Sequence, residues 1–126
     1  MSIQIAKGGA MNGFSPGDNM AMKVPADQFD ATVQFYRDVI GLRQIKKHLP
    51  SFVFDFNGKN LWIDKMDNLP RAEIWLEIRV DDVKTAAGYL KSHKVQRRDE
   101  VEKLPEGFDG FWISNPAGII HLVCND

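Results

Sequence analysis

Residues 35–42 read Phe-Tyr-Arg-Asp-Val-Ile-Gly-Leu, and this stretch indicates where the first helix of the chain ends. Apolar side chains recur three or four positions apart along it and upstream of it, at Phe29, Val33, Tyr36 and Ile40. Such spacing places them on one face of a helix. Gly41 then provides the left-handed residue with which many helices end. The sequence therefore predicts an amphipathic helix over about residues 27–40.

Strands are predicted on both sides of this helix. Residues 19–24 alternate between polar and apolar side chains, as in a strand with one buried face. After the helix, three apolar segments are expected to be strands, at residues 42–49, 51–56 and 61–65. Asn57-Gly58 between the last two predicts a tight hairpin turn. The first half of the chain therefore has the order strand, helix and three strands.

The second half repeats this order. Residues 73–80 alternate as a strand does, and Asp81 and Asp82 suit the first turn of a helix predicted over residues 82–93. Three further strands are expected over residues 96–103, 110–114 and 119–124. Val24 and Val80 precede the two helices at matching places, separated by nearly half of the 126 residues. A repeat of this length indicates duplication of one supersecondary unit.

The expected fold is a single α+β domain built from two βαβββ modules in tandem, at about residues 18–66 and 73–126. One such module cannot bury both faces of its sheet, so two mixed, curved sheets are expected to pack around a cavity. Residues 1–17 are rich in Gly, Ser and Asn and predict an irregular N-terminal arm, with a short strand at residues 3–6.

The composition excludes several classes of function. The net charge of −1 provides no positive surface for nucleic acid or for an anionic membrane. No apolar run is long enough for a transmembrane helix, and the N-terminus has no signal-peptide pattern. Cys124 is the only cysteine, which excludes an intramolecular disulfide and fits a reducing compartment. A cytoplasmic location is therefore expected.

Three motifs in this order resemble the vicinal-oxygen-chelate superfamily, which includes glyoxalases, bleomycin-resistance and fosfomycin-resistance proteins and extradiol dioxygenases. They are the helix end at residues 35–42, the start of the second helix at 79–83 (Arg-Val-Asp-Asp-Val) and the final hairpin at 115–122 (Asn-Pro-Ala-Gly-Ile-Ile-His-Leu). The resemblance covers about residues 19–124. It implies the two-module fold and, because single-domain relatives usually pair, a homodimer.

The resemblance also identifies where a metal would bind. Catalytic members hold a divalent metal with inward-facing His and Glu side chains, and the matching positions here are expected at Asn19, Trp62, Trp75 and His121. An indole is only a hydrogen-bond donor, and a neutral amide is a poor ligand for a transition metal. A catalytic metal normally needs about three protein ligands. The prediction is that no cofactor is bound, with a divalent metal as the alternative.

The polar faces of the same strands are expected to line the cavity. Trp62 and Trp75 would give it two flat rings, which favours a planar or aromatic small molecule. The remaining predicted ligand contacts are Asn19, Lys23, Asp64 and Arg79. His48 and His93 lie in polar, lysine-containing segments and are interpreted as surface residues.

Three functions follow as alternatives, with the two tryptophans favouring the first. The protein binds a small molecule without metal, resembling the bleomycin-resistance branch. Alternatively, it is a metal-dependent lyase, isomerase or dioxygenase-like enzyme with a site rebuilt around His121, Glu77 and Asp64. In the third, it is a metal-free enzyme with His121 as its base. In either enzyme, His121 and Glu77 are the candidate catalytic residues.

Overall fold

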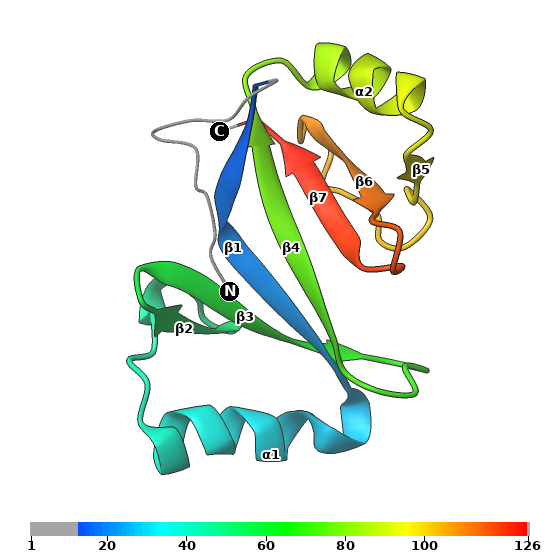
Figure 1. Ribbon diagram of the computed structural model, residues 1–126. Coiled ribbons are helices and arrows are strands. Elements are labelled where there is room, and N and C mark those ends of the chain that lie inside the picture. Colours follow the sequence, from blue (N-terminus) through cyan, green and yellow to red (C-terminus); the bar gives the residue numbers. More distant parts are fainter. Residues whose placement is uncertain (1–12, 126) are drawn as a thin grey trace, which may run out of the picture. The chain divides into compact units, whose positions relative to one another are not determined.

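The computed structural model describes residues 13–125 and is drawn in Figure 1. These residues fall into two compact units. The N-terminal unit is Asp18–Leu76, and the C-terminal unit consists of residues 13–17 together with residues 77–125. Two long strands, β1 (Phe14–Pro25) and β4 (Glu73–Val80), contribute to both units. No helix within residues 13–125 is long and apolar enough to cross a membrane.

The N-terminal unit has strand order β2-β3-β1-β4. Its other elements are η2 (Ala26–Gln28), α1 (Phe29–Gln34), η3 (Phe35–Ile40), η4 (Lys46–His48), β2 (Phe52–Phe56) and β3 (Lys59–Met66). β1 pairs with β3 in parallel, whereas β2 and β3 are antiparallel, so this part of the sheet is mixed. Asn57 and Gly58 both have positive φ in the predicted turn between β2 and β3.

The predicted first helix is present as one continuous stretch from η2 through α1 to η3. Gly41 ends it with φ 77°, as the sequence predicted. Val33 of α1 packs into a core with Val24 of β1 and Phe54 of β2, each at most 4% exposed. This helix therefore covers one face of the N-terminal part of the sheet (Figure 1). The polar side chains of β1, such as Asn19 and Lys23, lie on the other face.

One predicted strand of this unit is wrong. Residues 42–49 form only an isolated bridge, between Gln44 and Phe54, followed by the short turn η4. The alternation of apolar and polar side chains stops at the three consecutive basic residues of η4, and the backbone turns there instead of continuing along β2. Residues 13–125 therefore contain seven strands rather than the eight expected.

The C-terminal unit has strand order β4-β7-β6-β5 and one helix. Its elements are α2 (Val83–Ser92), β5 (Gln96–Arg97), β6 (Gly110–Ser114) and β7 (Ile120–Cys124). Asp82 caps α2 by accepting a hydrogen bond from the Thr85 backbone N–H at 3.1 Å, and this bond lowers the pKa of the Asp82 carboxyl. The helix packs through Ala86 on a core of Val80, Phe111, Ile113 and Val123. Both units thus carry a helix on one face of mixed strands, which confirms the predicted α+β fold.

Two segments of the C-terminal unit differ from the prediction. The strand expected over residues 96–103 is only two residues long, because the Asp99 side chain, rather than a continuing strand, accepts from the Trp112 N–H at 3.1 Å. Conversely, residues 14–17, expected in an irregular arm, belong to β1, and the Phe14 ring lies 5.7 Å from that of Tyr89 in α2. The short strand predicted at residues 3–6 lies outside the described residues.

Candidate small-molecule site

One face of the N-terminal unit gathers most of the predicted ligand contacts. The register pairs Asn19 with Asn60, Ala21 with Trp62 and Lys23 with Asp64. Successive side chains of a strand point to opposite faces, so these residues lie on the side away from the core under α1. Trp75 of β4 joins them through its contact with Lys23. The structure therefore brings together five predicted residues: Asn19, Lys23, Trp62, Asp64 and Trp75.

Lys23 and Trp75 form the buried part of this face. Lys23 is 3% exposed, and its Nζ lies 2.8 Å from Asp64 Oδ2 and 4.3 Å from the centre of the Trp75 ring. A carboxylate and the negative face of an indole both compensate a buried ammonium group for its lost hydration. Trp75 itself is 5% exposed, and its Nε1 donates to Glu73 Oε1 at 3.0 Å. Both side chains thus serve the packing of this unit.

Asn19 occupies the position expected for a metal ligand, but its side-chain oxygen is already engaged. Asn19 Oδ1 accepts one hydrogen bond from Trp62 Nε1 at 2.8 Å and another from Asn60 Nδ2 at 3.0 Å. An amide oxygen has two lone pairs, so both acceptor sites are used. A cation could bind this oxygen only by displacing one of these donors.

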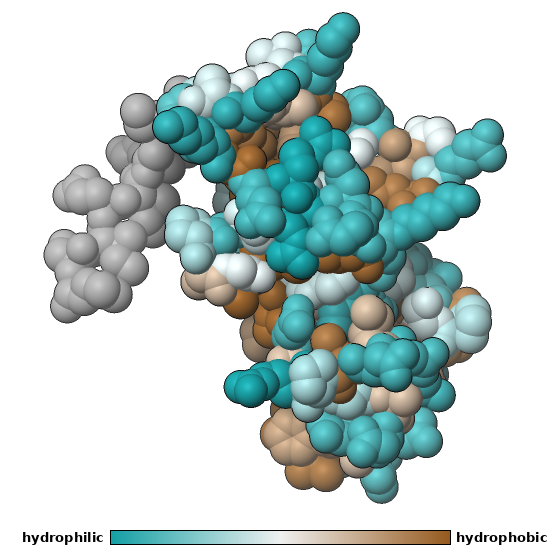
Figure 2. Space-filling view, turned by 90° about the vertical axis from the view of Figure 1, so that its right-hand side faces the viewer, coloured by the Kyte–Doolittle hydropathy of each residue, from teal (hydrophilic) through white to brown (hydrophobic). Residues whose placement is uncertain are grey.

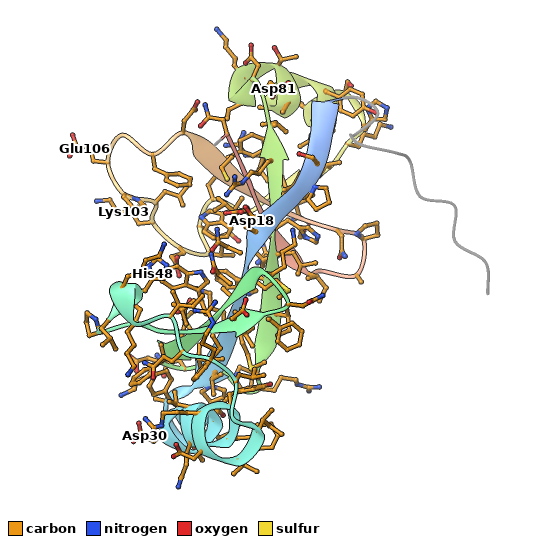
Figure 3. All side chains as sticks on the ribbon, turned by 90° about the vertical axis from the view of Figure 1, so that its left-hand side faces the viewer. Asp18, Asp30, His48, Asp81, Lys103 and Glu106 are labelled. Atoms are coloured by element: carbon orange, nitrogen blue, oxygen red, sulfur yellow. The ribbon has the colours of Figure 1, made fainter. Side chains whose placement is uncertain are left out.

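Trp62 is the more accessible tryptophan of this face, being half-buried where Trp75 is buried. The His48 ring lies 4.8 Å from the Trp62 ring, at an interplanar angle of 46°. His48 is on η4, the turn that precedes β2, where Figure 3 labels it. The interpretation of His48 as a surface residue therefore missed a contact with the face. Its lysine neighbours gave no sign of this, because the contact depends on how η4 returns the chain to β2.

Glu77 and Arg79 lie on the corresponding face of the C-terminal unit, opposite the core formed with Val80. Glu77 Oε1 is 3.4 Å from Arg79 Nε, and the Glu77 side chain is 9% exposed. β1 passes close to this carboxylate, because a Cβ added to Gly17 would overlap the Glu77 side chain. Burial, reinforced by the Glu77 charge, raises the pKa of the Cys124 thiol to about 11. Cys124 is therefore a protonated, buried strand residue at neutral pH.

The prediction that His121 shares an inward face with Glu77 is wrong. The register of β6 and β7 pairs His121 with Ile113 and Val123 with Phe111. Ile113, Phe111 and Val123 belong to the core under α2, so His121 points to the helix side of the sheet. Leu122 is the β7 residue that points to the same side as Glu77.

This correction changes the candidate sites in two ways. A catalytic pair of His121 and Glu77, or a rebuilt metal site that adds Asp64 to them, would need side chains from both faces of the C-terminal strands. The described residues contain no group of three His, Cys, Asp or Glu side chains placed to hold a metal ion. Of the four positions that the resemblance implies for metal ligands, Asn19, Trp62 and Trp75 carry an amide and two indoles, which do not fit a divalent metal, and His121 points to the helix side of the sheet.

Comparison with known proteins gives matches among solved structures only. No family model matches the sequence, and no curated protein matches it. The Mn(II)-bound glyoxalase from Novosphingobium aromaticivorans is 20% identical, with a TM-score of 0.64 over 90% of this chain and 40% of that one. Homoprotocatechuate 2,3-dioxygenase from Arthrobacter globiformis is 21% identical, with a TM-score of 0.59 over 90% of this chain and 37% of that one.

A third match is close to this chain in length. It is a glyoxalase/bleomycin resistance protein/dioxygenase superfamily member from Vibrio splendidus, 12% identical, with a TM-score of 0.55 over 85% of this chain and 97% of the other. This chain thus spans less than half of the glyoxalase and of the dioxygenase, and nearly all of the Vibrio protein. Together these similarities show that the chain has the vicinal-oxygen-chelate fold.

Proposed function

We propose that this protein binds a small organic molecule with a planar or aromatic group on the polar face of the N-terminal unit, and that it does so without a divalent metal. The observation that carries the proposal is the engagement of Asn19 Oδ1 by Trp62 and Asn60. At a position where the resemblance implies a metal ligand, this chain has a closed hydrogen-bond network that holds an indole in place.

The accessible side chains of this face indicate the chemistry of the ligand. Trp62 and His48 offer flat rings, and Trp62 cannot titrate or ligate a metal. Asp64 is 30% exposed in its side chain and binds Lys23 through Oδ2, while its Oδ1 makes no hydrogen bond within residues 13–125. A ligand that combines a flat ring with a hydroxyl or amine donor would therefore satisfy both parts of this face.

The two tryptophans have different roles in this proposal. Trp75, which is buried, supports Lys23 from below, whereas the half-buried Trp62 meets the ligand. Removing Trp62 should therefore weaken binding with a small effect on folding. Removing Trp75 should first destabilise the unit, because a buried aromatic side chain is lost.

The test uses indole, quinoline and 2-naphthol as flat probes and cyclohexanol as a non-planar control, with backbone amide NMR shifts as the measurement. We expect the flat probes to shift residues 60–64, and Trp62→Ala to weaken their binding by about 1–3 kcal/mol, or about 5- to 150-fold. Phe56→Ala is the matched control, because Phe56 is an exposed aromatic residue of the same unit on the α1 side of the sheet. Equal binding to the Trp62→Ala variant would refute the proposal.

A separate measurement tests whether the protein binds a divalent metal ion. Calorimetric titration with Mn²⁺ and Zn²⁺ should reveal no stoichiometric site of micromolar affinity. One tightly held ion per chain, lost in an Asn19→Ala variant, would show that the network opens to make a metal site. That outcome would favour the alternative of a metal-dependent lyase, isomerase or dioxygenase-like enzyme.

A further inference from the structure

A pocket of about 590 Å³ lies in the C-terminal unit on the α2 side of the sheet. Its apolar lining comes from Ile78, Val95 and Ile113. Its polar lining includes His93, Lys94, Gln96, Arg98, Asn115 and His121. This volume is within the range of small-molecule sites, and an apolar floor with a few polar groups is the usual composition of such sites. On the face drawn in Figure 2, hydrophobic surface is visible between hydrophilic side chains.

The charge of the pocket differs from that of the protein. The chain has a net charge of −1, yet Lys94 and Arg98 line the pocket and no Asp or Glu does. Arg98 donates from Nε to Glu100 Oε2 at 2.6 Å, which leaves both of its terminal nitrogens without a partner within residues 13–125. Lys94 makes no ion pair among the same residues. Lys94 therefore brings an unpaired positive charge to the pocket, while Arg98, although paired with Glu100, still offers its two terminal nitrogens as donors.

The two histidines of the pocket are oriented alike. His121 Nδ1 lies 3.0 Å from the Ile119 carbonyl oxygen, and His93 Nδ1 lies 3.0 Å from the Tyr89 carbonyl oxygen. A carbonyl accepts, so each Nδ1 carries a proton, and in the neutral ring each Nε2 is an acceptor for a donor group of a ligand. Asn115 likewise uses its side-chain oxygen to accept from the Ala117 and Ile119 N–H groups at 2.9 Å, so its remaining side-chain groups are donors.

Lys94 occupies a backbone conformation that favours glycine. It has φ 60° at the end of α2, where its N–H donates to the Lys91 carbonyl and the Val95 N–H donates to the Leu90 carbonyl, both at 3.0 Å. This is the hydrogen-bond pattern of a Schellman motif, whose left-handed residue is usually Gly. Strained positions of this kind concentrate at functional sites. A lysine here places an ammonium group at the pocket at a cost in backbone strain.

We infer that this pocket binds a small organic anion, whose carboxylate or phosphate group meets Lys94 and Arg98 while its apolar part lies on Ile78, Val95 and Ile113. This site goes beyond the proposed function, since it lies in the other unit and contains no tryptophan. A simpler explanation covers part of the lining: cations near a helix C-terminus interact favourably with the last carbonyls. It accounts for Lys94, which follows α2, but not for Arg98 or His121.

The experiment compares phenyl phosphate and benzoate with phenol, followed by backbone amide NMR shifts. The anions should shift residues 93–98 and 115–121 and bind more tightly than phenol. Lys94→Ala and Lys94→Gly both remove the ammonium group, and each should weaken phenyl phosphate by about two- to fivefold, the range of an exposed charge pair. Adding Arg98→Gln should bring the loss to about tenfold. Lys84→Ala, a charge removal elsewhere on α2, is the matched control and should leave affinity unchanged.

Several outcomes would overturn this inference. They are equal affinity for phenol and phenyl phosphate, unchanged affinity in both Lys94 variants, and no saturable binding below about 10 mM. Shifts confined to residues 60–64 would assign the anion to the other unit and also overturn it. Trp62→Ala distinguishes the two sites, because it should weaken the flat probes of the proposed function while phenyl phosphate binds as before. Each site can therefore fail independently of the other.

Discussion

Glycine destabilises the interior of a helix but stabilises a left-handed position after its C-terminus, and α2 allows both effects to be measured. Lys94 follows the C-terminus of α2 with φ 60°, where a side chain is strained. Gly88 lies inside the same helix, and a Cβ added there would meet nothing within 4 Å. We predict that Lys94→Gly stabilises the protein relative to Lys94→Ala, and that Gly88→Ala stabilises it relative to the natural sequence.

The magnitudes follow from the backbone. Both Lys94 variants lose the same ammonium group, so their difference isolates the cost of a side chain at φ 60°. The left-handed conformation costs a non-glycine residue about 1–2 kcal/mol, and the greater freedom of glycine in the unfolded chain offsets roughly 0.5–1 kcal/mol of this. We therefore expect Lys94→Gly to exceed Lys94→Ala by about 0.5–1 kcal/mol. Gly88→Ala should gain a similar amount, because alanine has the higher helix propensity.

Urea denaturation of the three variants, followed by circular dichroism, measures these differences as shifts of the unfolding midpoint at constant slope. A difference of 1 kcal/mol corresponds to about 3–6 °C in Tm for a domain of this size. If Lys94→Ala were as stable as Lys94→Gly, residue 94 would not be strained, and the argument that the pocket retains a lysine against its backbone preference would fail. The result for Gly88→Ala shows whether the assay resolves an effect of this size.

Three further predictions concern other parts of the molecule. Trp75→Ala should cost about 3–5 kcal/mol in urea denaturation, because it removes a buried indole beneath Lys23. Cys124, with a thiol pKa of about 11, should react slowly with iodoacetamide at pH 8, and Glu77→Gln should lower that pKa and speed the reaction. Since an unperturbed thiol has a pKa of 9.0, any stability from the protonated Cys124 thiol is present below pH 9 and lost between pH 9 and about 11. The protein should sediment as a homodimer at tens of micromolar, as the resemblance implies, and a monomer would contradict this.

The sequence predicted the elements whose side chains keep a strict period. β4 has the predicted bounds, Glu73–Val80, and α2 lies within the predicted helix. The sequence-based prediction was wrong where this alternation stops. Residues 42–49 lose their alternation at the basic turn η4, and β5 ends after two residues because the Asp99 side chain takes over a backbone pairing. A side chain that replaces a backbone partner in this way depends on the tertiary structure, so no local sequence pattern predicts it.

The same reasoning explains why the polar face of one unit could be predicted and the position of His121 could not. In β1, Asn19 and Lys23 alternate with methionines and Val24, so the polar face is evident from the residue types. In β7, the neighbours of His121 are apolar on both sides, so residue types do not decide which way the strand faces. Only the pairing of His121 with Ile113 decides it.

The resemblance implies a metal ligand at Asn19, and the structure adds why a histidine there would not by itself create a metal site. A histidine in place of Asn19 would remove the oxygen that accepts from Trp62 Nε1 and Asn60 Nδ2. An unpaired donor costs about 1–3 kcal/mol when it is fully buried and less at the half-buried Trp62, and the new imidazole would still lack carboxylate partners at Trp62 and Trp75. Each residue of this face is supported by its neighbours, so a change of chemistry here would require several substitutions together. Under the proposed function, ligand preference would therefore change through the accessible Trp62 and His48, while the buried Lys23 and Trp75 stay as they are.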